Sequence, residues 1–314
     1  NGGLIHLQLA LIYGQANNRA LEIVNSTNVS INRLSIDSRY GTNSTPAVNV
    51  ENSTLSTITQ LTLQASEFQP GLQLFNSSVG EIRQVHLTTP RATSLSLVLS
   101  SSVGRLQDYV GGEIALFSSS INQIERATIA GQQPYPALLL TRAFPTAPRS
   151  YIMTIRNSQL SGVIGVKAEH ESSVDLIAQT GINASAIGIY LPSGSIDRIE
   201  GCQILVDGLF EAASGIKLEN AGRSTFSLHE VVDSTITVTA EQGRGVQIDG
   251  NTVHRLSNLT IQMVGAHGDA VALSGNATLN ELLDSALRPD GSGQCVSIEP
   301  GSRILVENGN KCVE

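Results

Sequence analysis

The apolar residues of the chain recur as short alternating pairs, in which two apolar residues flank one other residue. In a well-formed example, Val246-Gln247-Ile248 is followed by the turn Asp249-Gly250-Asn251 and by a second alternating segment at 259–263. Alternation predicts a strand with one buried side, and the Asp-Gly-Asn sequence predicts a turn. The pairs are Leu21/Ile23, Val48/Val50, Leu72/Leu74, Leu97/Leu99, Ile114/Leu116, Leu138/Leu140, Ile164/Val166, Ile187/Ile189, Ile216/Leu218, Val246/Ile248, Val271/Leu273 and Val296/Ile298.

Successive pairs start 23 to 30 residues apart, except that only 17 residues separate the start at Leu97 from the next one. A polar turn and further short apolar segments complete each repeat. Such a repeat is too thin to bury its own apolar face, so the repeats must stack on one another. Asn25, Asn52 and Asn76 begin sequons and share one repeat position, which we interpret as a ladder of side-chain amides that hydrogen-bond between repeats.

This pattern resembles the right-handed parallel β-helix, the architecture shared by pectate-lyase-like carbohydrate enzymes, phage tailspikes and bacterial autotransporter passengers. The resemblance covers roughly residues 19–310 and carries no catalytic motif by itself. A leucine-rich repeat has a similar period, but its fixed leucine signature and helical second half are missing. We therefore predict an all-β, right-handed parallel β-helix of about 12 three-strand coils over residues 19–314.

Residues 1–18 fall outside the repeat and are predicted to form an N-terminal cap. In residues 1–15 the apolar positions fit both helical and strand spacing, so both remain open. Either element would cover the apolar core and the unpaired strand edges that the end of a solenoid exposes.

The composition agrees with a long, narrow core and argues against several classes of function. The chain is 40% hydrophobic and 15% charged, with 29 Gly and no Trp. Its net charge of −8, with basic residues thinly spread, argues against nucleic acid and anionic membrane as partners. Because no apolar run is long enough to span a bilayer, we expect no membrane insertion.

Three cysteines bear on the location of the protein. Cys295 and Cys312 flank the last apolar segment, and a disulfide between them would clamp the C-terminal end of the stack. Two unpaired buried cysteines are the alternative. Pairing fits an extracellular, cell-surface or periplasmic protein, whereas Cys202 is expected to be a small core residue.

Equivalent residues of successive coils lie in a row, about 4.8 Å from one coil to the next. The position after the apolar pair and the outward position between the paired residues together carry Lys167, Tyr190, Lys217, Glu219, Gln247 and Asp249. We interpret Glu219 and Asp249 as candidate catalytic carboxylates, at about the separation used by retaining glycosidases. The other four residues are candidate binding residues. The alternative is a solvated strand face with a Lys-Glu pair.

The segment 265–271, Gly-Ala-His-Gly-Asp-Ala-Val, is faintly similar to the polygalacturonase family, in which a Gly-His-Gly turn and an Asp-Asp pair supply base and acid. The similarity implies catalytic roles for His267 and Asp269. In this chain the glycines are separated and only one Asp is present. Without such a role, His-Gly-Asp is an ordinary turn. No zinc spacing, phosphate loop, serine elbow or aligned Asp run occurs, so neither metal nor cofactor is expected.

The expected function is that of a secreted or surface-exposed scaffold for adhesion, binding or assembly, without catalysis. Its expected partners are a polysaccharide or a surface protein, and the chain is expected to associate end to end or side by side. The alternative is a carbohydrate-active enzyme, either a polysaccharide lyase or a glycoside hydrolase. We expect a ligand on the face from Lys167 to Asp249, since the N-terminal coils carry Phe75, Ser100 and Phe117 at the equivalent position.

Overall fold

The computed structural model describes residues 6–7, 11–13, 19–38, 45–66, 68–208, 213–219, 227–265 and 267–313. The described residues form strands and connecting turns without a helix, and the chain is a parallel β-solenoid of about 11 turns. The predicted all-β parallel coil is therefore confirmed. The predicted number of about 12 coils counts strand starts, and twelve strand starts enclose eleven turns. The chain divides into two compact units, residues 1–158 and 159–314.

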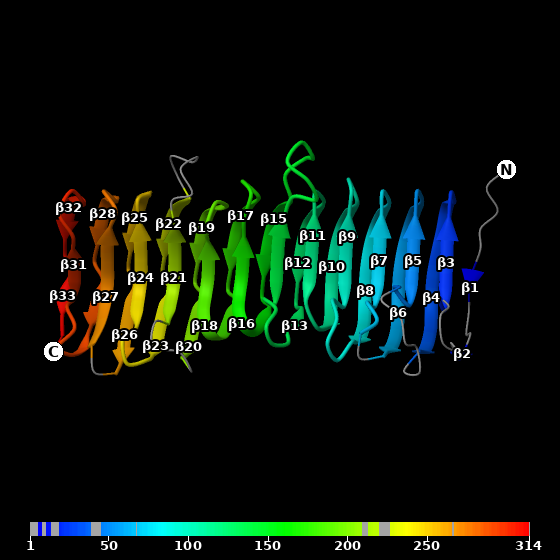
Figure 1. The fold of residues 1–314 in the computed structure, drawn as a ribbon, viewed down its shortest axis with the longest axis horizontal. Coiled ribbons are helices and arrows are strands. Elements are labelled where there is room, and N and C mark those ends of the chain that lie inside the picture. The colour runs from blue at the N-terminus through cyan, green and yellow to red at the C-terminus, as the bar shows by residue number, and fades with distance from the viewer. Residues whose placement is uncertain are drawn as a thin grey trace. The chain divides into compact units, whose positions relative to one another are not determined.

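The first unit contains strands β1 to β15 (Figure 1). Their bounds are β1 (His6–Leu7), β2 (Leu11–Tyr13), β3 (Leu21–Val24), β4 (Thr27–Ser38), β5 (Val48–Glu51), β6 (Thr54–Ala65), β7 (Leu72–Phe75), β8 (Ser78–Thr88), β9 (Leu95–Val98), β10 (Ser102–Gly111), β11 (Ile114–Phe117), β12 (Ser120–Glu125), β13 (Thr128–Ala130), β14 (Leu138–Thr141) and β15 (Tyr151–Arg156). The short strands β3, β5, β7, β9, β11 and β14 pair in parallel as one ladder.

The second unit contains strands β16 to β33. Their bounds are β16 (Gln159–Ala168), β17 (Ser173–Ala178), β18 (Gly181–Leu191), β19 (Ser195–Glu200), β20 (Gln203–Asp207), β21 (Ser214–Glu219), β22 (Leu228–Val232), β23 (Thr235–Thr239), β24 (Arg244–Asp249), β25 (Thr252–Ser257), β26 (Thr260–Val264), β27 (His267–Ser274), β28 (Thr278–Leu283), β29 (Ala286–Arg288), β30 (Asp290–Gly291), β31 (Val296–Ile298), β32 (Arg303–Asn308) and β33 (Lys311–Cys312).

Inward-facing residues of successive coils stack into apolar columns. In the second unit one column runs through Ile216, Val246 and Val271, each with no exposed surface. Because each coil covers the apolar face of its neighbour, burial is completed by stacking and not within a coil.

One corner of the coil is fixed by a residue in the left-handed backbone region. In the first unit this column contains Arg33, Gln60, Gln84, Asp108 and Arg126, with φ between 50° and 55°. In the second unit glycine takes the position twice, at Gly201 and Gly309, where it adopts positive φ without steric cost. Successive coils therefore share the backbone conformation of this corner, although the side chains at this position differ.

A buried column of hydroxyls ties the coils together at another corner. The backbone N–H of Ser53 donates to Ser77 Oγ at 3.0 Å, and that of Ser77 donates to Ser101 Oγ at 3.2 Å. Each hydroxyl also donates to a carbonyl two or three residues before it. At the predicted asparagine position, Asn76 Nδ2 donates to Asn52 Oδ1 at 2.8 Å, so this part of the amide ladder is present.

The strand pairing corrects the predicted register at two places. Leu95 and Leu97, not Leu97 and Leu99, stack on Leu72 and Leu74. In the second unit Ile189 stacks on Ile216, so the pair Ile187/Ile189 lies two residues out of step with Ile216/Leu218. Both errors arise because three alternating apolar residues follow one another, and alternation alone does not show where the strand begins.

At the N-terminus, β1 and β2 both pair in parallel with β4, which favours the strand interpretation of this segment over the helical one. Residues 1–5, 8–10 and 14–18 lie outside the described residues. The cap at 1–18 therefore stays a prediction.

The Glu113 carboxyl group lies inside the first unit. Glu113 is 4% exposed and occupies a column otherwise filled by small residues, namely Ala47, Gly71, Ser94 and Ala137. Thr93 Oγ1 donates to Glu113 Oε2 at 2.9 Å, the only hydrogen bond to this side chain among the described residues. Burial, only partly offset by this bond, raises the Glu113 pKa to about 7.

Two of the three cysteines form a disulfide and the third is a free core residue, as the sequence indicated. The Sγ atoms of Cys295 and Cys312 are bonded, and their Cα atoms lie 5.8 Å apart. Cys312 pairs with the buried Leu287, so the bond closes the interior of the last coil. Cys202 is 1% exposed, and burial raises its thiol pKa to about 11, as expected for a core residue and not for a nucleophile.

Candidate functional site

The predicted binding residues form one continuous row on the second unit. Lys167 pairs with Tyr190, Tyr190 with Lys217, and Lys217 with Gln247, on strands β16, β18, β21 and β24. The sequence spacing predicted that Lys167 and Tyr190 share a row with Glu219 and Asp249. The strand pairing shows that they do not. The carboxylates lie two residues further along their strands, because Ile189 and not Ile187 stacks on Ile216.

The side chains of this row engage one another. Lys167 Nζ lies 6.0 Å and Lys217 Nζ 5.6 Å from the centre of the Tyr190 ring, so the phenol is sandwiched between two cations. Lys217 Nζ is 2.6 Å from Glu219 Oε1, and the Tyr190 hydroxyl donates to Glu219 Oε2 at 2.5 Å. Lys167 has its own partner, Glu169 Oε2, at 2.6 Å.

These contacts fix the charge states of Tyr190 and Glu219. Burial, followed by the neighbouring Glu219 carboxylate, raises the Tyr190 pKa, so the hydroxyl stays protonated and acts as a donor. Burial also acts to raise the Glu219 pKa, but hydrogen bonds from Lys217 and Tyr190 outweigh it and lower the pKa. Glu219 is therefore an ionised carboxylate with both oxygens occupied.

Glu219 and Asp249 are directly paired across β21 and β24. Neighbouring strands are about 4.8 Å apart, so the separation alone would suit two cooperating carboxylates. Glycoside hydrolysis by such a pair also needs one protonated carboxyl group and one free nucleophile or base. Glu219 is ionised and both of its oxygens are occupied, so it does not supply the protonated carboxyl group.

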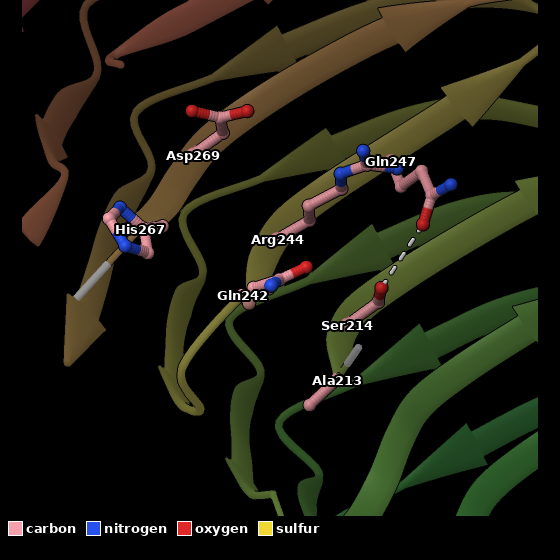
Figure 2. Close-up of a pocket in the computed structure, with 8 residues that line it drawn as sticks. Ala213, Ser214, Gln242, Arg244, Gln247, His267 and Asp269 are labelled. Atoms are coloured by element: carbon pink, nitrogen blue, oxygen red, sulfur yellow. Dashed lines mark hydrogen bonds between the residues drawn. The ribbon is translucent and has the colours of Figure 1, made fainter. Parts of the chain in front are cut away.

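A polar cavity of about 250 Å³ opens next to Gln247 (Figure 2). We call it the Arg244 pocket; it is lined by Ala213, Ser214, Gln242, Gly243, Arg244, Gln247, His267 and Asp269. Paired positions on three neighbouring strands supply Ser214, Arg244 and Asp269. The pocket thus shares Gln247 with the row of lysines and Tyr190 but excludes Glu219 and Asp249.

The polar groups of the Arg244 pocket differ in what they contact. Ser214 Oγ donates to Gln247 Oε1 at 3.3 Å, and Asp269 Oδ1 accepts from the Gln294 backbone N–H at 2.8 Å. Within the described part of the chain, the Arg244 guanidinium has no ion-pair or hydrogen-bond partner. In Figure 2 the Arg244 side chain extends along β24 toward Gln247. An unpaired cation therefore lines a cavity that otherwise contains hydrogen-bonding groups.

His267 and Asp269 lie in strand β27 and not in the turn that the Gly-Ala-His-Gly-Asp sequence suggested. The start of β27 pairs antiparallel with β30, with His267 opposite Gly291. The His267 ring nitrogen Nδ1 contacts Ser292 Oγ. Residues 290–294 thus hold both side chains at one edge of the pocket. Gly268 between them is buried, and the Met263 side chain lies next to it.

Sequence reasoning missed Arg244. The prediction rests on the positions after and within the apolar pairs, whereas Arg244 lies two residues before Val246. The sequence signal for Arg244 is an arginine followed by glycine at the start of an alternating segment. This signal indicates a site only once the strand pairing places Arg244 between Ser214 and Asp269.

The chain matches no protein-family model, and no curated protein matches it significantly. Among the described residues no group of three or more His, Cys, Asp or Glu side chains is arranged to hold a metal ion. No described segment forms a helix able to cross a membrane.

In the first unit the row of residues that follow the apolar pairs also differs from the prediction. Phe75 pairs with Val98, and Val98 with Phe117, so Val98 replaces Ser100 in this row. The three half-buried side chains make a short apolar strip with no acid or base in it. The only candidate contacts that this strip offers are apolar, in contrast to the charged row of the second unit.

Proposed function

We propose that the protein is a secreted or surface-exposed scaffold that binds polysaccharide without cleaving it, and that the Arg244 pocket holds one sugar residue of the polymer. The unpaired Arg244 guanidinium is the observation that carries this proposal. A cation in a polar cavity that has no partner among the described residues is available to a ligand, whereas Lys167 and Lys217 are already engaged.

The chemistry of the pocket favours a sugar with one carboxylate and several hydroxyl groups. A planar guanidinium binds a carboxylate through two parallel hydrogen bonds. The amides of Gln242 and Gln247 both donate and accept, as sugar hydroxyls require. The Asp269 carboxylate accepts hydroxyl protons and repels a second negative charge, so a monoanionic residue is favoured over a multiply sulfated one.

The size and surroundings of the pocket fit one part of a longer ligand. At about 250 Å³ the cavity is smaller than the pockets that enclose whole drug-sized molecules. Neighbouring residues of a polymer would extend along the rungs that carry Gln247, Lys217 and Tyr190. The disulfide at the end of the second unit supports a location in an oxidising compartment, where extracellular polysaccharide is met.

Arg244→Gln is expected to weaken binding of an acidic polysaccharide by about tenfold or more, since a charge-assisted hydrogen bond contributes about 1.5–3 kcal/mol. Isothermal titration calorimetry with polygalacturonate, and with a neutral polysaccharide for comparison, measures the effect. Arg288→Gln, which removes the same charge from an exposed site outside the pocket, is the matched control. Equal weakening by both variants would show that only net charge matters.

The alternative is a carbohydrate-active enzyme, favoured by the fact that His267 and Asp269 both line the Arg244 pocket. Assays for new reducing ends and for unsaturated uronate absorbance separate the two functions. We expect no turnover, because Glu219 is held by Lys217 and Tyr190. Turnover that disappears in His267→Ala and Asp269→Ala would establish an enzyme that uses this pocket, and turnover that disappears in Glu219→Ala and Asp249→Ala would establish one that uses the carboxylate pair. Polysaccharide binding that Arg244→Gln leaves unaffected would show that the Arg244 pocket is not the binding site.

A further inference from the structure

The row of side chains that contains Arg244 changes from polar to apolar along the second unit. Arg244 pairs with Asp269 on one side and with Ser214 on the other. The next two members of the row are Ile187 on β18 and Ile164 on β16, which are both partly exposed. We call these two side chains the Ile187 patch; it begins one rung beyond the part of the Arg244 pocket that Ser214 lines.

The Ile187 patch runs beside the row of Lys167, Tyr190 and Lys217. Ile187 and Tyr190 lie three residues apart on β18, which is about 10 Å along the strand. The two residues between them are buried, and so are the residues at the equivalent positions of the neighbouring strands. These buried pairs are Gly165-Val166, Gly188-Ile189, Gly215-Ile216 and Gly245-Val246. No side chain of these strands stands between the two rows, so a ligand that lies there contacts both.

The two lysines beside the Ile187 patch are not available to a second carboxylate of a ligand. Lys167 Nζ is paired with Glu169 and Lys217 Nζ with Glu219, each at 2.6 Å. A ligand group that covers the isoleucines therefore gains little from negative charge. An apolar group gains more, because its contact with the isoleucines removes both apolar surfaces from water.

The distance along the solenoid places the Ile187 patch at a different sugar residue from the one in the Arg244 pocket. Neighbouring rungs are about 4.8 Å apart, so Ile187 lies two rungs, or about 10 Å, from Arg244. A polymer that leaves the pocket toward Tyr190 passes Ile187 with a residue further along its chain. The carboxylate and the apolar group must therefore belong to different residues of one polymer.

We propose that the Ile187 patch binds a methyl-bearing substituent of the acidic polysaccharide whose carboxylate the Arg244 pocket holds. An acetyl group and the C6 methyl group of a 6-deoxy sugar both supply this chemistry. The inference rests on the proposed function and narrows its ligand class to polymers that carry both carboxylates and methyl groups. A polymer of unsubstituted acidic residues would use the pocket but not the patch.

Isothermal titration calorimetry with galacturonate oligosaccharides tests the inference, because O-acetylation adds methyl groups to them and keeps their carboxylates. The unmodified chain is expected to bind a methyl-bearing oligosaccharide about fourfold more tightly than the plain one, the factor for burial of one methyl group. Oligosaccharides that alternate galacturonate with rhamnose, a 6-deoxy sugar, are the second methyl-bearing probe. Comparison of the two probes shows which kind of methyl group the patch accepts.

Two substitutions of nearly equal shape separate apolar contact from structure. Ile187→Thr is expected to abolish the preference for methyl-bearing oligosaccharides and to leave the affinity for the plain ones unchanged. Ile187→Val keeps an apolar side chain and is expected to keep the preference. Leu205→Thr is the matched control, since Leu205 is 44% exposed and pairs with Asn183, outside both rows.

Three results would overturn the inference. The first is equal affinity of the unmodified chain for all three kinds of oligosaccharide. The second is a preference that Ile187→Thr leaves unchanged; if that variant does not fold, the same reading applies to Ile164→Thr. The third is an equal loss of preference in Leu205→Thr. All three leave the proposed function standing as long as Arg244→Gln weakens binding of the plain oligosaccharides. If Arg244→Gln has no effect on any of them, the proposed function fails, and this inference fails with it.

Discussion

Replacement of Glu113 by glutamine is expected to stabilise the protein by about 3 kcal/mol at pH 8 and to leave its stability nearly unchanged at pH 4. The Glu113 pKa rises from 4.5 to about 7 on folding, because the carboxyl group is enclosed in the apolar interior. At pH 4 the carboxyl group is largely protonated in both states and contributes no penalty. Between pH 4.5 and 7 it ionises in the unfolded chain first, so the unfolded state is favoured as pH rises.

Glutamine keeps the shape of this side chain and its acceptor for Thr93 Oγ1, but it never ionises. The penalty above pH 7 therefore disappears in the variant. Guanidinium unfolding at pH 4, 6 and 8, compared with the unmodified chain, measures the difference. A Glu113→Gln variant that is less stable than the unmodified chain at pH 8 would show that the ionised carboxylate has a favourable partner.

Glu125→Gln supplies a control of opposite sign in the same unit. Glu125 lies 2.5 Å from Arg105 Nη2, and this hydrogen bond together with Arg156 and Arg126 lowers its pKa. The ionised Glu125 side chain stabilises the folded protein at pH values above its pKa in the unfolded chain. This stabilisation is lost as the pH falls through the lower pKa of the folded state. Glu125→Gln is therefore expected to destabilise the protein at neutral pH, where Glu113→Gln stabilises it.

Removal of the disulfide by Cys295→Ser and Cys312→Ser together is expected to destabilise the last coil by about 3 kcal/mol, the chain-entropy value for a loop of this length. The bond closes a loop whose ends are 17 residues apart, and it joins the start of β31 to β33. Each of these strands is paired on one side only, so local opening of residues 296–313 costs few other contacts.

Hydrogen exchange followed by mass spectrometry measures this effect segment by segment. Peptides from 296–313 are expected to exchange much faster in the double variant, whereas peptides from β21 and β24 are expected to keep their protection. Cys202→Ser is the matched control, because the neighbouring column position is a serine, Ser234, whose Oγ accepts the Cys202 backbone N–H at 3.1 Å. Unchanged exchange at 296–313 in the double variant would mean that packing alone holds the last coil.

The coil architecture could be predicted because alternation and repeat spacing are local properties of the sequence. The register could not be predicted everywhere, since a run such as Leu95-Ser96-Leu97-Val98-Leu99 contains two equally good apolar pairs. The structure resolves this choice by the left-handed residue that ends the strand, Leu99 in this coil, at φ 49°. Leucine is not a residue that sequence reasoning assigns to such a corner.

The candidate site could be predicted only where the register of the strands is clear from the sequence. Lys217 and Gln247 could be placed in one row because their flanking apolar residues are unambiguous. Arg244 and Glu113 were missed because each lies just before an apolar segment. The meaning of that position depends on neighbours 19 to 30 residues away, namely Ser214 and Asp269 for Arg244, and Ser94 and Ala137 for Glu113.

The recurring corner of the coil has a consequence for how the length of the molecule can change during evolution. Gln60 and Gln84 occupy equivalent corners with nearly equal φ, and they are followed by Leu61 and Val85, which are both buried. Loss of residues 61–84 would join Gln60 to Val85 and remove one complete rung, while the rungs on either side keep matching corners and strands. Insertion of a single residue within a strand would instead turn its outward side chains inward. Gene variants that gain or lose whole coils should therefore survive more often than those with small insertions.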